Sequence, residues 1–236
     1  MKNKLKTFLS QNTKRKTMRQ KVKIGISVVV FLLAGISGLI AQDATANKIL
    51  GNVSRTYQTY KTIKAGFTIN VKNAQSNSSI KQSGTLYLKG KKFRINLNDQ
   101  EIYCDGKTMW TYFKEENEVQ VTKYDPNAQE INPSEIFTIY KKGFNYKYTG
   151  EIVSGGKKIQ RIELTPQNKN KPYFKVKLNI DKATHKITNM KVMNKNGVNS
   201  TYSITSFKSN LTMNDGFFKF DKSKKPGVVI IDLTKP

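Results

Sequence analysis

The chain has 236 residues, with 42 Lys and Arg against 16 Asp and Glu, and it contains one cysteine and one histidine. A single cysteine excludes an intramolecular disulfide. One histidine and one cysteine are also too few for the usual zinc sites or for a spaced metal-binding cluster.

The first 40 residues have the composition of an export signal. Residues 1–23 carry nine Lys or Arg and no acid, and residues 24–40 are seventeen uncharged, mostly apolar residues. A basic region followed by such an apolar region is typical of a secretory signal peptide. Because Met18 is followed closely by three further basic residues, a signal of ordinary length would begin there, and Met18 is an alternative start.

Small residues after the apolar region favour removal of this signal. They are Ala41 and the group Ala44-Thr45-Ala46. We therefore predict a signal peptide over residues 1–46 and a single domain over residues 47–236, a length that suits one domain. The alternative is an uncleaved membrane anchor, since a spanning helix needs about 20 apolar residues. No cysteine directly follows the apolar region, so a diacylated anchor of the bacterial lipoprotein type has no attachment site.

The predicted domain is strongly basic, with a net charge of +18 from Asn47 onward. Only three of its basic residues are arginine: Arg55, Arg94 and Arg161. Because recognition of bases and phosphates prefers arginine, we expect no nucleic-acid partner. Lysines alternate with apolar residues, as in residues 174–178, which is typical of a solvated outer face of a sheet. Transient contact with anionic membrane surfaces is the alternative role of this charge.

Residues 47–63 have apolar side chains at spacings of three and four, which place them on one face of a helix. These side chains are Ile49, Leu50, Val53, Tyr57, Tyr60 and Ile63. The sequence therefore predicts an amphipathic helix that packs against a sheet.

After Gly66 the apolar period changes to two, which is typical of strands. Alternating positions are Phe67, Ile69 and Val71, then Leu86 and Leu88, then Phe93, Ile95 and Leu97, and later residues 173–180. Hairpin turns are predicted at Asp105-Gly106, Gly155-Gly156 and Asn196-Gly197. About ten strands joined by short loops predict one large antiparallel sheet, which must curl or close to cover its edges.

One helix interrupts the predicted strands. Residues 132–135, Asn-Pro-Ser-Glu, combine a capping side chain, proline at the first helical position and glutamate at the third. Ile136, Phe137, Ile139 and Tyr140 make the helix largely apolar, and Gly143 ends it. Such a helix must cover an apolar surface, either as a fixed plug at one end of a barrel or as a movable lid.

Candidate catalytic groups are few. His185 lies in the polar turn 181–186, where we expect it to be exposed, and the acids Glu115, Glu116 and Glu118 cluster at a hairpin tip. The sequence has no Gly-rich phosphate loop and no nucleophile motif. Cys104 is expected to be buried. We predict a binding protein rather than an enzyme, without cofactor or metal.

Three consecutive segments of the predicted strands have a recognisable order and spacing. They are Gly84-Thr85-Leu86-Tyr87-Leu88-Lys89, Lys92-Phe93-Arg94 and Cys104-Asp105-Gly106-Lys107-Thr108-Met109-Trp110-Thr111-Tyr112. Together they resemble the outer-membrane lipoprotein carrier proteins, the LolA family. The order and spacing match the pattern of consecutive strands in that family, in which the D-G-K-T-x-W segment is the most specific. The similarity continues through the Pro133 helix to Phe218-Lys219-Phe220 and Pro226-Gly227-Val228.

The resemblance implies a mainly β fold with some α-helix, an incomplete antiparallel barrel of about 10–11 strands wrapped over the amino-terminal helix and a short helical lid. It implies a periplasmic carrier that holds the acyl chains of lipoproteins. Its partners would be an inner-membrane lipoprotein-releasing transporter and an outer-membrane acceptor, and we expect a monomer. The residues expected to line the cavity and lid are Leu86, Leu88, Phe93, Ile95, Trp110, Ile136, Phe137 and Ile139.

The sequence departs from the family at one position. Many members have an arginine after the lysine that ends the first long strand, and this arginine holds the lid to the sheet. Here Gly90 follows Lys89. A lid held by apolar contact alone, or a related carrier of another envelope lipid or glycolipid, would account for the difference. A sensor or adhesion module of the same fold is the remaining alternative.

Overall fold

In the computed structural model, which describes residues 43–73, 75–76, 78–126, 136–141 and 143–234, the first element is helix α2 (Ala44–Gln58). It begins before the predicted start at Asn47 because Asp43 caps it. One carboxylate oxygen of Asp43 accepts the backbone N–H groups of Thr45 and Ala46 at 2.9 and 3.1 Å. The predicted helical stretch also extended too far, since Ile63 already starts the first strand.

Twelve strands form one open sheet in the described part of the chain. They are β1 (Ile63–Asn73), β2 (Ser79–Lys89), β3 (Lys92–Leu97), β4 (Gln100–Cys104), β5 (Thr108–Phe113), β6 (Glu118–Lys123), β7 (Phe144–Ser154), β8 (Lys157–Pro166), β9 (Tyr173–Asp181), β10 (Ile187–Asn194), β11 (Val198–Ser209) and β12 (Val229–Asp232). Their order is β12-β6-β5-β4-β3-β2-β1-β11-β10-β9-β8-β7. The predicted incomplete barrel is confirmed, with one exception to its antiparallel pattern: β12 pairs in parallel with β6.

The three predicted glycine turns are confirmed as hairpin connections. Gly106 joins β4 to β5, Gly155 and Gly156 join β7 to β8, and Gly197 joins β10 to β11. All four glycines have positive φ angles, between 55° and 95°. Tight turns of this kind require the left-handed conformation that glycine adopts at little cost.

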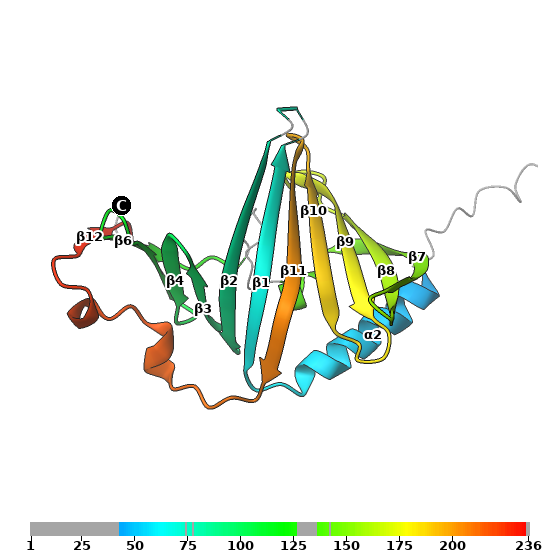
Figure 1. Cartoon of the computed structure of the whole chain (residues 1–236), viewed down its shortest axis with the longest axis horizontal. Coiled ribbons are helices and arrows are strands. Elements are labelled where there is room, and N and C mark those ends of the chain that lie inside the picture. Colours follow the sequence, from blue (N-terminus) through cyan, green and yellow to red (C-terminus); the bar gives the residue numbers. More distant parts are fainter. Residues whose placement is uncertain (1–42, 74, 77, 127–135, 142, 235–236) are drawn as a thin grey trace, which may run out of the picture. The chain divides into compact units, whose positions relative to one another are not determined.

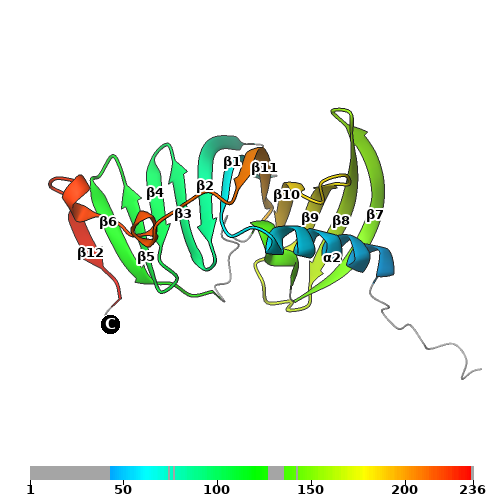
Figure 2. The same cartoon turned by 90° about the horizontal axis from the view of Figure 1, so that it is seen from below.

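Helix α2 lies across one face of the half-sheet β7–β11, as Figures 1 and 2 show. Its two ends are bonded to different strands. At its start, Asp43 accepts the backbone N–H of Tyr148 in β7 at 2.8 Å. Near its end, the Tyr57 hydroxyl accepts the N–H of Ile187 in β10 at 3.0 Å. We call the sheet face that α2 covers the inner face, and the opposite one the outer face.

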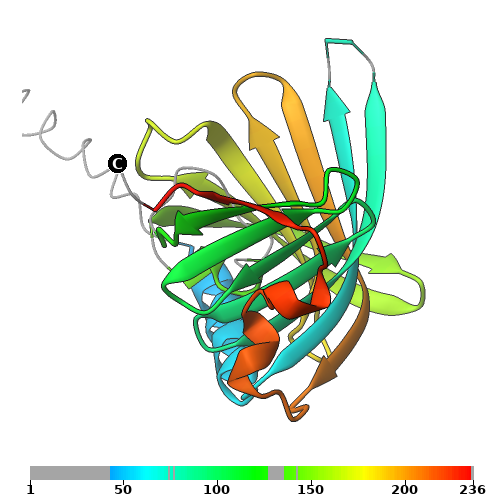
Figure 3. The same cartoon turned by 90° about the vertical axis from the view of Figure 1, so that its left-hand side faces the viewer.

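The C-terminal segment, residues 211–234, crosses the outer face of the strands β2–β6 (Figure 3). It contains the 3-10 turns η3 (Asp215–Phe218) and η4 (Lys222–Lys224), and it ends in β12. Lys89 and Lys92 bind the Asp215 carboxylate at 3.0 and 2.6 Å, which ties η3 to the end of β2 and the start of β3. Hydrogen bonds from Lys92 and then Lys89 lower the Asp215 pKa to about 2.

The helix predicted from residue 132 is only partly described, since residues 132–135 lie outside the described residues. Residues 136–141 form 3-10 turns rather than an α-helix, including η2 (Ile139–Lys141). Gly143 has a φ of +82° and follows this segment, as predicted for a residue that ends a helical turn.

Candidate functional site

The inner face of the sheet is apolar across nine neighbouring strands, in the order β4-β3-β2-β1-β11-β10-β9-β8-β7. Buried side chains from strands β1–β4 and β7–β11 and from α2 belong to one continuous cluster. Among them are Leu86, Phe93, Ile95 and Cys104 at one side, and Ile162, Leu164, Leu178, Ile180, Ile187 and Met190 at the other. Alternation of side chains along each strand puts these residues on one face and leaves the lysines of the same strands on the other.

A cleft of about 340 Å³ opens at one end of this face. Leu88, Phe93 and Tyr124 form its apolar walls, and Lys91, Lys92 and Thr138 also line it. The Tyr124 ring packs edge-on against Phe93 at 5.7 Å between ring centroids. The described parts of the fold therefore leave an opening where the segment 136–141 meets the sheet.

A second cleft, of about 410 Å³, is lined by Tyr173, Val192 and Tyr202 together with polar residues of the β10–β11 turn. It lies at the opposite end of β1 from the first. In the sheet register, Leu88 of the first cleft is opposite Ile63, whereas Ser200 of the second is opposite Val71. The apolar face is thus accessible from both ends of the central strands.

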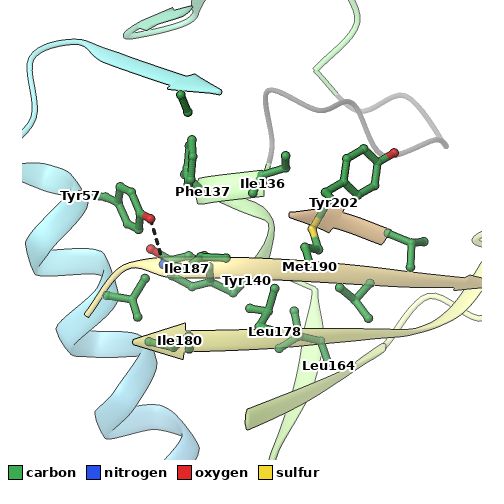
Figure 4. Close-up of a cluster of buried hydrophobic side chains, with 14 of the residues drawn as sticks. Tyr57, Ile136, Phe137, Tyr140, Leu164, Leu178, Ile180, Ile187, Met190 and Tyr202 are labelled. Carbon is green, nitrogen blue, oxygen red and sulfur yellow. Dashed lines mark hydrogen bonds between the residues drawn. The ribbon is translucent and has the colours of Figure 1, made fainter. Parts of the chain in front are cut away.

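The segment 136–141 packs between α2 and the sheet. Phe137 stacks on Tyr57 with ring centroids 4.9 Å apart, and it meets Phe207 edge-on at 5.9 Å. Figure 4 shows Ile136, Phe137 and Tyr140 among the side chains of β8–β11. The segment is a packed part of the core in this structure, held by apolar contacts and by a hydrogen bond from the Tyr146 hydroxyl to the Tyr140 carbonyl at 2.8 Å.

Electrostatically, the inner face disfavours charge. Burial raises the pKa of the Cys104 thiol to about 11 and raises the pKa of the Tyr57 hydroxyl as well. Among the described residues, Thr62 and Asp181 are the buried polar or charged residues, and the Asp181 carboxylate accepts N–H groups of its own turn. An environment of this kind suits hydrocarbon and disfavours ions.

The described residues offer little for metal or acid–base chemistry. No group of three or more His, Cys, Asp or Glu among them could hold a metal ion. His185 lies in the turn between β9 and β10, as predicted, with a positive φ of 54°. It is half-buried rather than exposed, and its Nδ1 atom is buried against the protein. No helix in the described ranges is long and apolar enough to cross a membrane.

Residues 58–221 match the family described as outer membrane lipoprotein carrier protein LolA. The chain belongs to the LolA family. It is 23% identical over 214 residues to the outer-membrane lipoprotein carrier protein of Coxiella burnetii, covering 88% of this chain and 98% of that protein. It is 27% identical over 198 residues to an uncharacterized protein of Methanocaldococcus jannaschii, covering 81% of this chain and 56% of that protein. The chain therefore spans little more than half the length of the archaeal relative.

The fold is also similar to the crystal structure of an uncharacterized conserved protein from Thermus thermophilus. The TM-score is 0.51 at 12% identity, over 80% of this chain and 99% of that one. At this identity the likeness concerns the fold alone.

Seven of the eight residues predicted for the LolA cavity and lid lie in or against the apolar cluster of the inner face. Leu86, Phe93, Ile95, Ile136 and Phe137 are buried there, and Leu88 and Ile139 are partly buried. The prediction for Trp110 is wrong in its facing. Trp110 lies on the outer face, in a second cluster with Tyr112, Val119 and Val228. A shift of one residue in a strand reverses its facing, and this outer cluster joins residues of β5 and β6 to Val228 and Phe220 of the C-terminal segment.

Sequence reasoning missed the aromatic residues that surround Phe137 and the two clefts. They are Tyr57, Phe207, Tyr124, Tyr173 and Tyr202. Tyr57 and Tyr173 were assigned to the correct elements from their spacing, but spacing does not show which elements meet. The position of the family's arginine is Gly90, with a φ of +59°, at the edge of the first cleft.

Proposed function

We propose that this protein is a carrier that holds the acyl chains of lipoproteins against its inner face and moves them from the inner to the outer membrane. The observation that carries the proposal is the continuous apolar inner face with a cleft at each end. Each methylene transferred from water to such a surface contributes about 0.8 kcal/mol, so a modest apolar contact holds an acyl chain. The relative in Coxiella burnetii, by its name, has the same task.

The proposed carrier acts in the periplasm after export and removal of the signal peptide. Its partners are acylated lipoproteins, an inner-membrane transporter that releases them and an outer-membrane acceptor. In this proposal the protein catalyses no reaction and needs no cofactor, because burial of the acyl chain supplies the binding free energy.

A second candidate function is binding of a different envelope lipid or glycolipid. Gly90 favours it, because the side chain that latches the lid in many members of the family is missing there. The two candidates share the apolar site and differ in cargo. Mass spectrometry of lipid extracted from the protein purified from its own envelope separates them: acylated peptides support the lipoprotein carrier, and free lipids support the alternative.

The apolar site itself is tested with a fluorescent acyl probe and the variant Leu88→Glu. Leu88 is partly buried and lines the first cleft, so a carboxylate there lies where the acyl chain must pass. We expect the variant to bind the probe at least about tenfold more weakly, since a charged group replaces apolar surface that the acyl chain must contact. Val153→Glu, at an exposed tip of β7, is the matched control and should bind as the wild type does. Equal probe binding by Leu88→Glu and wild type, at equal melting temperatures, would contradict the proposed site.

A further inference from the structure

A cleft of about 500 Å³ lies on the outer face, between strands β3 and β4 and the C-terminal segment. It is separate from the two clefts of the inner face. Its charged lining consists of four cations, Arg94, Lys219, Lys224 and Lys225, and two acids, Glu101 and Asp221. We call it the cationic cleft.

Both acids of the cationic cleft are already bonded within the protein. Glu101 accepts a hydrogen bond from the Tyr103 hydroxyl and forms ion pairs with Arg94 and Lys225 at 3.4 and 3.6 Å. Asp221 caps η4 by accepting the backbone N–H of Ser223, and it forms an ion pair with Lys224 at 3.2 Å. With four cations against two engaged carboxylates, the cleft keeps an excess of positive charge toward solvent.

The Arg94 guanidinium is held in a fixed position in the cleft. It lies over the Tyr103 ring at 4.6 Å and over the Phe217 ring at 4.8 Å, so aromatic rings of the sheet and of the C-terminal segment both contact it. Its Nε also donates to the Asn96 side chain at 2.9 Å. A guanidinium that is positioned in advance loses little freedom when it binds an oxyanion. Lys219 and Lys224, with side chains 59% and 78% exposed, pair with Asp105 at 3.9 Å and with Asp221 at 3.2 Å. Exposed ion pairs of this kind contribute little free energy, so both lysines can turn to the same anion at small cost.

The same C-terminal segment exposes apolar side chains just beyond the cleft. Val229, Ile230 and Leu233 are 57%, 45% and 55% exposed along the outermost strand β12 and the residue after it. Edge strands commonly carry charge, and β12 carries one acid, Asp232, beside its exposed aliphatic side chains. Basic residues beside exposed aliphatic residues are the composition of surfaces that lie at the interface of anionic membranes.

We propose that the C-terminal segment docks on the surface of an anionic lipid bilayer, with a lipid phosphate in the cationic cleft and the β12 edge among the headgroups. The occupant follows from charge complementarity and from the aliphatic edge, which a soluble anion would not use. This goes beyond the proposed carrier function, because it assigns the membrane contact to one surface, on the face opposite the cargo site. It does not depend on the identity of the cargo.

The test compares two pairs of lysine substitutions that change the net charge equally. Lys219→Gln with Lys224→Gln removes two exposed cations of the cleft, and Lys72→Gln with Lys81→Gln removes two exposed lysines of β1 and β2. Binding to vesicles of phosphatidylglycerol and phosphatidylcholine is measured by sedimentation at low salt. We expect the cleft variant to bind about 25-fold more weakly than wild type, since each lysine near an anionic surface contributes about fivefold in affinity. The control variant should lose less than about threefold.

The aliphatic edge is tested with Ile230→Ser against Val153→Ser, which replaces a still more exposed residue on the opposite edge of the sheet. The first variant should weaken vesicle binding and the second should not. Equal losses for both lysine pairs would show attraction by net charge alone and overturn the proposal. So would a wild-type protein that does not bind the anionic vesicles, or that binds vesicles of phosphatidylcholine alone equally well. Melting temperatures of all variants, whose substituted side chains are exposed, confirm that each is folded.

Discussion

At the scale of single residues, Asp43 connects the start of helix α2 to the edge of the sheet. One carboxylate oxygen caps α2 and the other accepts the Tyr148 N–H of β7. These bonds, that of Tyr148 first and that of Ala46 next, hold the Asp43 pKa below its ordinary value. Because the residue directly precedes the helix, a mature chain that begins at Asn47 would lose the cap and the first helical turn.

The first prediction concerns the substitution Asp43→Ala in the mature protein. We expect the melting temperature to fall by about 2–4 °C, since the helix cap and the bond to β7 are both lost. Asp43→Asn, which keeps a capping oxygen, should fall less. A carboxylate whose pKa is lowered on folding stabilises the protein above its unfolded pKa and ceases to do so as the pH falls. The difference between wild type and Asp43→Ala should therefore shrink below about pH 4.

Amino-terminal sequencing of the protein isolated from its own cells tests the proposed signal cleavage together with this cap. If cleavage keeps the helix cap, Asp43 stays in the mature chain, and the cleavage site lies after Ala41 or Gln42. If the mature chain begins at Asn47 and melts at the same temperature as a chain that keeps Asp43, the role assigned to Asp43 is contradicted.

At the scale of elements, the sequence predicts what depends on local chemistry. Glycine turns, the period of two in the strands and the apolar stripe of α2 follow from backbone conformation and from alternation, and they are confirmed. The facing of Trp110 is a different matter. Both faces of β5 are covered, one by the core and one by the C-terminal segment, so Trp110 and Met109 are both apolar and the pattern does not distinguish inside from outside.

The second prediction concerns the segment 136–141, for which the sequence left a plug and a lid as alternatives. Phe137 is 1% exposed and stacks on Tyr57. We therefore expect Phe137→Ala to lower the free energy of unfolding in urea by about 3–5 kcal/mol, as for other buried aromatic residues. Ile139→Ala, at a partly buried position, should cost less and serves as the comparison. Normal stability of Phe137→Ala would indicate that the segment leaves the core in the free protein, as a lid does.

At the scale of the whole domain, the two faces of one sheet have different physical chemistry. The inner face combines side chains from strands far apart in the sequence, such as β3 and β9, into one apolar surface. The period of two in the apolar residues predicts that each strand has an apolar face. It does not predict that these faces join into one surface, because that depends on the order of the strands in the folded sheet. The parallel pairing of β12 was beyond sequence reasoning for the same reason, since it depends on where a long irregular segment crosses the outer face.

The last prediction separates these two faces by their response to salt. Association with anionic vesicles relies on lysines in water, so it should fall at least about tenfold between 50 and 500 mM salt, as the Debye length shrinks from about 14 to about 4 Å. An acyl probe on the inner face is held by burial of hydrocarbon, which salt screens little, and its affinity should change by less than about twofold. Both quantities are measured on the same preparation, by vesicle sedimentation and by probe fluorescence. Loss of the probe in parallel with vesicle association would place the acyl-binding site on the charged outer face and would contradict the inner-face site.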